Sequence, residues 1–582
     1  MTIDGISKQR RKPTGADAGR PVIAGVNHMV SAGHYLAAVA AFEVLEAGGN
    51  AIDAGVAGGI ALGVVQSDMV NFAGVAPIIV RNGTSGEVKS ISGLGWWPRA
   101  MTPTLFRDRH EGKIPLGVLR SVVPAAPDAW IRALREFGTM SFGEVATAAI
   151  RLARDGFVMY PALVDSITTW EKEYSQWPTS APIYLPGGQP PRSGEKFVQS
   201  DLANTLQYMV DQEAAAAGRG REAGLDAARD AFYRGDIAKA IAQFHADNGG
   251  LMTLDDLAEY ASEIEDTPRV AFEGVDVHGC GAWCQSPSFL QILQMLKFGD
   301  VGEYGHNTAD YLHHFVEIIK LAFADRHAYI GDPRFVPVPM DLLTSESYAR
   351  ERLARIDPEK SIPDIPIQGG YRDPSLPLSL EPRLDPTGPV PDTSYICVVD
   401  RWGNCFSATP SDVSFDTPVI PGTGLTVSSR GSQSWADPDH PSSVLAGKRP
   451  RLTPNPALAV GADGRLIPFG TPGGDVQVQA MAQVLMNLLV HGMSPQQAVE
   501  VPRFASYSFP DSFEPHELFP GRLNLEEGIG KAVGADLAAR GHDVNWWPDL
   551  TGRAAAVCLV DSKNGVHQGA ADPRRPGYAI GW

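Results

Sequence analysis

The chain has few cysteines, and none of them forms a paired motif. Its 582 residues include five cysteines, and no two of them are separated by only two residues. The odd count and the missing CxxC pair exclude a disulfide scaffold and a zinc knuckle. The five are Cys280, Cys284, Cys397, Cys405 and Cys558.

Positive charge is also scarce. Lysine and arginine number 49 against 67 aspartate and glutamate residues, which gives a formal net charge of −18. A nucleic-acid-binding protein needs a basic surface, and so does a protein that docks on an anionic membrane. We therefore predict neither nucleic acid nor membrane among the partners.

Long apolar runs are absent as well. The longest, Ala54 to Val65, is glycine-rich and too short to span a bilayer. The N-terminal stretch MTIDGISKQRRKPTGADAGRPV has basic residues but no apolar segment behind them, so it does not have the pattern of a secretory signal. We expect a soluble cytoplasmic protein.

Two familiar types of ligand motif are missing. The glycine-rich stretch 55–63 has no Walker lysine and no GxGxxG after a strand, so it indicates close helix packing rather than phosphate binding. His28, His34, His313 and His314 show no HExxH or similar spacing. We predict no metal and no organic cofactor.

The patterns that are present indicate an α+β layered sandwich. Apolar spacing predicts two helices after a loose N-terminal arm (1–30), the second capped by Asn50 with Asp53 three residues later. Residues 120–350 are mostly helical apart from a strand at 269–278, and hairpins are expected at 77–91, 393–409 and 457–470. Helical blocks beside antiparallel hairpins favour layers rather than a parallel sheet.

Residues 356–392 form a proline-rich segment. Nine prolines lie between positions 358 and 391, so neither a continuous helix nor an inner strand can form there. The segment ends at Asp392, and a strand pattern begins at Thr393 with TSYICVVD. We interpret it as an extended linker at the end of a first segment, 1–392, before a second, 393–582.

Thr393 has the chemistry of a self-activated nucleophile if the chain is cut before it. A threonine hydroxyl is a poor nucleophile without a base, but the α-amine of an N-terminal threonine can act as that base near neutral pH. Acyl transfer also needs donors for the developing oxyanion. Gly473 and Gly474 offer backbone N–H groups between a strand and a helix start. The alternatives are an ordinary strand-initiating threonine and a plain strand-to-helix turn.

From about residue 28 to residue 582 the sequence resembles the gamma-glutamyltranspeptidase family of N-terminal-nucleophile hydrolases. The resemblance rests on ordered motifs: EVLEAGGNAIDAGVA, DTSYICVVDRWGN, PGTGLTVSSRG, DPDHPSSVLAGKRPRLTPNPAL, TPGGDVQVQ, MSPQQAVEVPRF and DPRRPGYAIG. It implies a four-layer αββα sandwich built jointly by both segments, and cleavage of a precursor between Asp392 and Thr393.

The resemblance also implies site residues. Thr393 matches the nucleophile, Ser394 the hydroxyl that follows it, and Gly473 and Gly474 the oxyanion pair. A second active-site hydroxyl matches Thr409 or Ser411, and the residue after the GKRP motif is Thr453.

The sequence departs from the family where a glutamyl head group is bound. Arg430 and Gln433 stand where an amide and an aspartate hold the substrate's amine, and Phe72 to Val75 replaces a glycine-glycine-acid loop. Arg107 lies near the expected place of the arginine that binds the α-carboxylate. Arg430 would repel an ammonium and attract a carboxylate.

The sequence therefore predicts an autoprocessed amidohydrolase or acylase whose substrate is a small carboxylate-bearing N-acyl compound. Asp412 or Asp416 could still supply a counter-charge for an amine, and Trp435 could cover the acyl group or simply pack. One alternative is a gamma-glutamyl transferase or glutathione hydrolase, and another is an unprocessed, silent ligand-binding protein. The expected partners are the substrate, the two segments of one precursor and a possible second copy of the chain.

Overall fold

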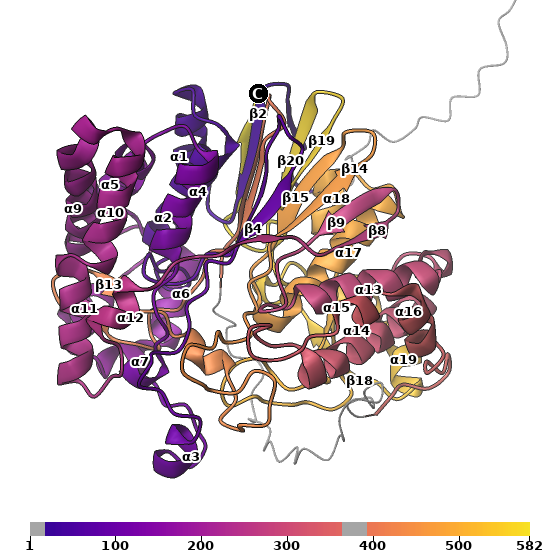
Figure 1. The fold of residues 1–582 in the computed structure, drawn as a ribbon. Coiled ribbons are helices and arrows are strands. Elements are labelled where there is room, and N and C mark those ends of the chain that lie inside the picture. The colour runs from indigo at the N-terminus through magenta and orange to yellow at the C-terminus, as the bar shows by residue number, and fades with distance from the viewer. Residues whose placement is uncertain (1–17, 364–392) are drawn as a thin grey trace, which may run out of the picture.

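Two seven-stranded antiparallel sheets face one another, with helices on the outer side of each (Figure 1). The computed structural model describes residues 18–363 and 393–582. In spatial order the first sheet contains β21 (Tyr578–Gly581), β2 (His28–Ala32), β10 (Ile396–Asp400), β11 (Cys405–Ala408), β3 (Ile78–Arg81), β4 (Val88–Ile91) and β7 (Ile264–Asp266). The second contains β1 (Ile23–Gly25), β20 (Val566–Ala571), β19 (Cys558–Lys563), β15 (Leu466–Gly470), β14 (Ala457–Gly461), β9 (Val275–His278) and β8 (Arg269–Phe272).

The helices divide into two outer layers. Against the first sheet lie α1 (Tyr35–Glu46), α2 (Ala51–Val65) and α4 (Ala126–Phe137), and outside them pack α5 (Phe142–Asp155), α9 (Ser200–Ala216) and α10 (Arg221–Tyr233). Against the second lie α13 (Ser286–Phe298), α17 (Gln477–Leu489) and α18 (Pro495–Glu500), and outside them pack α14 (Ala309–Tyr329), α16 (Glu346–Leu353) and α19 (Lys531–Ala539). The predicted αββα sandwich is confirmed.

Shorter elements connect these layers. The helices are α3 (Leu105–Arg109), α6 (Pro161–Thr169), α7 (Glu171–Ser175), α8 (Ala181–Tyr184), α11 (Asp236–Asp247), α12 (Leu254–Ala258) and α15 (Met340–Leu343). The strands are β5 (Phe157–Val158), β6 (Lys196–Phe197), β12 (Val419–Ile420), β13 (Leu425–Thr426), β16 (Phe504–Ser506), β17 (Arg522–Glu526) and β18 (Asp543–Trp547). No described helix is both long and apolar enough to cross a bilayer.

Helix α2 packs closely on the first sheet because of its glycines. A Cβ on Gly55 would lie 2.1 Å from the Phe406 ring, and one on Gly58 would lie 2.1 Å from the Ile396 side chain. The helix begins with the predicted capping box, in which the Asn50 side chain accepts from the Asp53 N–H and the Asp53 carboxylate accepts from the Asn50 N–H. The close packing expected of this segment is confirmed.

Two expectations about strands are wrong. Residues 28–32 are not part of a loose arm, because β2 pairs with β10 and β21 inside the first sheet. Residues 269–278 form a hairpin of two strands, because Glu273 and Gly274 both have positive φ values, 45° and 82°, and turn the chain back. The proline-rich part 364–392, including Asp392, lies outside the described residues.

Between the two sheets lies an apolar layer that contains every cysteine of the chain. All five thiols are buried and free, beside Tyr395, Val399 and Leu458. Burial raises the pKa of the Cys405 and Cys558 thiols, the latter to about 12. Cys405 and Cys558 therefore act as buried, unreactive packing residues.

Both sheets contain strands from the two predicted segments. The strand that follows Thr393, β10, pairs on one side with β2 and on the other with β11, which in turn pairs with β3. In the second sheet β20 pairs with β1, and β14 pairs with β9. The nucleophile candidate therefore lies at the start of a central strand, held by neighbours from both segments.

Candidate active site

Thr393 is completely buried just before β10, in a backbone conformation that is unusual for its side chain. Its φ is 72°, in the left-handed region that β-branched residues rarely adopt. Its N–H donates to the Met69 carbonyl over 3.3 Å, and its carbonyl accepts from Arg575 Nη1 over 3.4 Å. Strain of this kind costs roughly 1–3 kcal/mol and is concentrated at functional sites.

The hydroxyl of Thr393 contacts one of the two hydroxyls suggested by the sequence. Thr393 Oγ1 lies 2.7 Å from Ser411 Oγ, which also accepts a hydrogen bond from Arg430 Nη2. Thr409 Oγ1 is buried and has no hydrogen-bond partner among the described residues. The structure brings Ser411, and not Thr409, to the nucleophile candidate.

This difference gives a paired prediction. Ser411→Ala removes the contact that orients the Thr393 hydroxyl, and we expect kcat to fall about 100-fold, because small misplacements of a reacting group have effects of this size. Thr409→Val keeps the shape of the side chain and removes a hydroxyl that makes no hydrogen bond among the described residues, so its kcat should stay within about twofold. Steady-state kinetics on the cleaved proteins checks both, and equal losses would contradict the assignment.

Arg430 is part of a buried ion pair. It begins the short 3₁₀ helix Arg430–Gln433, and its Nε lies 3.5 Å from Asp412 Oδ1, both side chains being about 1% exposed. Asp412 also accepts hydrogen bonds from the Ser428 hydroxyl and from the Ser429 N–H and hydroxyl, at 2.6, 2.8 and 3.0 Å. Burial raises the pKa of the Asp412 carboxyl, and Arg430 and these donors offset part of the rise.

Gln433 and Thr453 bind one another in the same site. Gln433 Nε2 donates to Thr453 Oγ1 over 2.7 Å, and the Thr453 N–H donates back to Gln433 Oε1 over 3.3 Å. A third member, Gln285, precedes α13 and stands in no motif that the sequence analysis identified. Its Nε2 donates to the carbonyls of Thr453, at 2.6 Å, and Gly474, at 3.0 Å, and so fixes the glycine turn to the Thr453 loop.

The glycine turn has a shape that other residues cannot adopt easily. Gly473 and Gly474 have φ values of 126° and 55°. Within the part of the chain that the structure describes, neither N–H group donates a hydrogen bond. The next residue, Asp475, is fixed by Arg326 and by Ser512, whose N–H and hydroxyl both donate over 2.7 Å. The turn is held rigidly while its N–H groups remain available.

Ser394 faces away from this group. A Cβ on Gly33 would lie 2.3 Å from Ser394 Oγ, so only glycine fits at that position. The Ser394 N–H donates to the Pro410 carbonyl over 3.0 Å. Ser394 therefore fixes the start of β10 against the chain leading into α1.

The structure does not bring Arg107 to the site. It lies on α3, which projects at one end of the molecule in Figure 1, and its side chain is 57% exposed. The apolar residues Leu105 and Phe106 turn the other side of this helix inward.

Asp416 pairs with Arg120 at 2.7 Å, and Trp435 stacks between His440 and His516, so neither is open to substrate in the way the sequence allowed.

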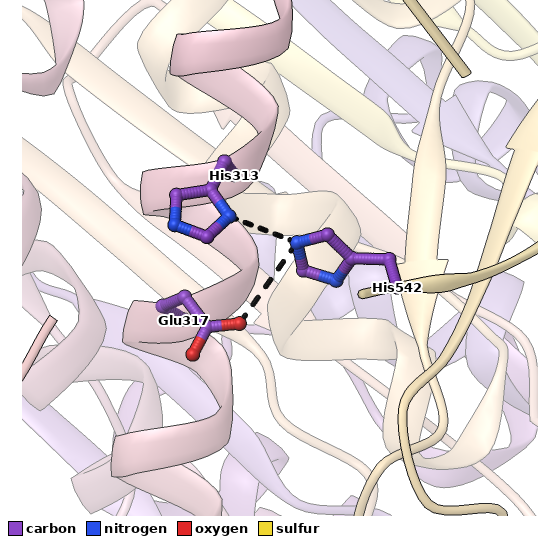
Figure 2. Close-up of side chains that lie close together, drawn as sticks. All are labelled: His313, Glu317 and His542. Atoms are coloured by element: carbon purple, nitrogen blue, oxygen red, sulfur yellow. Dashed lines mark hydrogen bonds and ion pairs between the residues drawn. The ribbon is translucent and has the colours of Figure 1, made fainter. Parts of the chain in front are cut away.

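A group of metal-ligand side chains lies elsewhere, against α14 (Figure 2). His313, Glu317 and His542 are buried together, with His313 Nδ1 2.9 Å from His542 Nε2. The Lys320 ammonium already contacts Glu317 at 2.7 Å, and His313 Nε2 donates to the Asp357 carbonyl. A divalent cation would have to compete with that ammonium, so the group fits a hydrogen-bond network better than a ligand set.

Comparison with known proteins identifies the family. The model described as Gamma-glutamyltranspeptidase matches residues 37–582. Acylase ACY 1 proenzyme of Pseudomonas sp. (strain SE83) is 33% identical over 570 residues, 96% of this chain and 94% of that protein. Glutathione hydrolase-like YwrD proenzyme of Bacillus subtilis (strain 168) is 31% identical and covers 96% of this chain and 99% of its own length.

A solved structure has a similar fold over the whole chain. The crystal structure of cephalosporin acylase from Bacillus halodurans matches with a TM-score of 0.82 at 26% identity, covering 100% of this chain and 99% of that one. The chain belongs to the gamma-glutamyltranspeptidase family of N-terminal-nucleophile hydrolases. The predicted family and enzyme class are confirmed.

Proposed function

We propose that the chain is an autoprocessed amidohydrolase that cleaves a small N-acyl compound through an acyl-enzyme on Thr393. The observation that carries the proposal is the Thr393 hydroxyl, buried at the start of β10 and 2.7 Å from Ser411 Oγ. Relatives named as acylase proenzyme and oxamate amidohydrolase proenzyme support this class of reaction.

In the proposed precursor the Thr393 hydroxyl attacks the carbonyl of residue 392 and forms an ester, which water then hydrolyses. The positive φ of Thr393 strains the backbone next to the bond to be cut. Cleavage frees the α-amine, which becomes the base for the same hydroxyl. The N–H groups of Gly473 and Gly474 would hold the oxyanion in both reactions.

For the acyl group we propose a chain that ends in a carboxylate, such as a dicarboxylic half-amide. Arg430 and Gln433 provide the donors on this side of Thr393. On the Ser411 side of Thr393, Asp412 is paired with Arg430, Asp416 with Arg120 and Asp475 with Arg326. A substrate ammonium would have to displace one of these pairs, which a substrate without an amine avoids.

The experiment is a side-by-side comparison of glutaryl and gamma-glutamyl anilides, which differ only by the α-amine. We expect kcat/KM to be at least about tenfold higher for the glutaryl compound, because a buried ammonium without a partner costs more than the 1.4 kcal/mol that a factor of ten represents. Arg430→Lys keeps the charge that Asp412 needs but loses the planar fork, so it should lower the glutaryl rate selectively.

Arg107→Ala is the matched control, since it removes an exposed arginine outside the site and should change neither rate. Faster turnover of the glutamyl compound would instead support a glutathione hydrolase. Asp412 favours that second function, because it places an acid beside an arginine within the site.

A further inference from the structure

A cavity of about 380 Å³ lies close to the main chain of Thr393, and neither Ser411 nor Arg430 lines it. Met69 and Arg575 both line it, and these two residues hold the main chain of Thr393 through the hydrogen bonds to its N–H and carbonyl. Its other walls come from the segment that follows α2, from helix α6 and from two short stretches, 551–553 and 574–576. The polar lining includes Gln66, Asp68, Tyr160, Asp165, Ser166 and Arg553.

The proposed reaction determines which part of the substrate lies close to the Thr393 nitrogen. The amine of a cleaved Thr393 takes the hydroxyl proton, and when the C–N bond of the substrate breaks, the leaving nitrogen keeps the electron pair and receives that proton. The leaving amine must therefore approach the Thr393 nitrogen. The N–H of Thr393 donates to the carbonyl of Met69, which lines the cavity, whereas the Thr393 hydroxyl contacts Ser411.

Asp68 is an exceptional acid in the wall of this cavity. It is fully buried, and neither carboxylate oxygen accepts a well-formed hydrogen bond from any residue that the structure describes. The Ser166 hydroxyl, also in the wall, lies close enough to interact with Asp68 but makes no well-formed hydrogen bond to it. A buried carboxylate in this state is costly unless a ligand supplies donors.

The electrostatics of the wall agree with a cationic ligand group at Asp68. Burial raises the pKa of the Asp68 carboxyl to about 6, and Ser166, nearby backbone N–H groups and Arg575 offset part of that rise. Arg574 is already neutralised by Glu526 and Asp572. Asp165, at the exposed mouth, and Asp68, inside, balance Arg553 and Arg575 in the lining.

We propose that this cavity is the subsite for the leaving amine, and that Asp68 selects leaving groups that carry an ammonium in addition to the scissile nitrogen. The inference rests on the proposed function, because it uses the Thr393 amine as the proton carrier. It makes Asp68 a specificity-determining residue that does not touch the reacting atoms.

The test uses two glutaryl amides with leaving groups of similar size. One is the amide of 4-methylaniline, and the other is the anilide of 4-(aminomethyl)aniline, which carries an ammonium. We expect the native enzyme to favour the ammonium compound about tenfold or more in kcat/KM, the effect of one charge-assisted hydrogen bond. Asp68→Asn should abolish this preference while the methyl compound reacts within about twofold of the native rate.

Asp165→Asn is the matched control, because it removes an exposed acid from the same cavity and should keep the preference. If the native enzyme shows no preference for the ammonium compound, the inference is overturned before any variant is tested. An equal loss of kcat/KM on both amides in Asp68→Asn also overturns the inference, because it would show that Asp68 has a structural role. A change in the glutamyl-to-glutaryl ratio in Asp68→Asn would place Asp68 on the acyl side and also overturn it. Failure of the native enzyme to hydrolyse either amide would instead reject the proposed function.

Discussion

Thr393→Ala is expected to leave a single polypeptide of 62.3 kDa with no measurable amidase activity. The substitution removes the hydroxyl that would attack both the chain and the substrate, and an uncut chain has no free α-amine at this position to serve as base. Loss of a nucleophile typically costs about 10⁴-fold or more in kcat, so residual turnover should be below detection.

The native protein should show two bands on a denaturing gel, about two thirds and one third of the chain. N-terminal sequencing of the smaller should begin Thr-Ser-Tyr, at residue 393. Thr393→Ser is the control, because it keeps a hydroxyl and should still be cleaved. A different first residue, or full activity in Thr393→Ala, would reject the assignment, and an uncut native chain would favour the silent ligand-binding alternative.

Gly473→Ala is expected to lower kcat about 100- to 1,000-fold, the usual effect of losing an oxyanion donor. An alanine disfavours φ of 126°, and its Cβ would lie 3.2 Å from the Ala555 Cβ, so the peptide has to rotate and its N–H changes direction. KM should change much less than kcat, because the donor acts mainly on the charge that develops during reaction.

Gly464→Ala provides the control for backbone strain. Gly464 has φ of 81° in the turn between β14 and β15, and nothing lies within 4 Å of the added Cβ. Both variants should lose about 1 kcal/mol or more of unfolding free energy, but only Gly473→Ala should lose activity. Kinetics and thermal unfolding measured together check this, and a similar kcat in the two variants would remove the oxyanion role.

The sequence predicted those features that depend on neighbours along the chain. Asn50 and Asp53 are three residues apart, so their capping box could be predicted. The glycines of α2 predicted close packing, but not which element the helix would pack against. The position of Thr393 followed from the change between a proline-rich stretch and a strand pattern. The αββα fold came from ordered motifs, because periodicity alone cannot decide how two sheets stack.

Contacts across the fold could not be predicted. Gln285 lies 168 residues from Thr453, and His542 lies 229 residues from His313, so no local pattern connects either pair. Asp68 belongs to none of the motifs in the sequence, and only the structure shows that it is buried next to Met69, whose carbonyl accepts from the Thr393 N–H. Arg430 and Asp412 were both noticed, but a sequence gives no measure of whether two opposite charges neutralise one another.

The sharing of both sheets between the two segments has a consequence for how the protein folds and persists. Because β10 pairs with β2 and β11 with β3 in the first sheet, and β20 with β1 and β14 with β9 in the second, neither sheet is complete until both segments are present. Folding of the precursor would be unimolecular, with the long linker keeping its two parts together at high effective concentration. Once cut, the enzyme would have lost that connection, and reassembly after unfolding would depend on two separate chains meeting. The mature form would then persist because it unfolds slowly, so that its working lifetime is set by a rate rather than by an equilibrium.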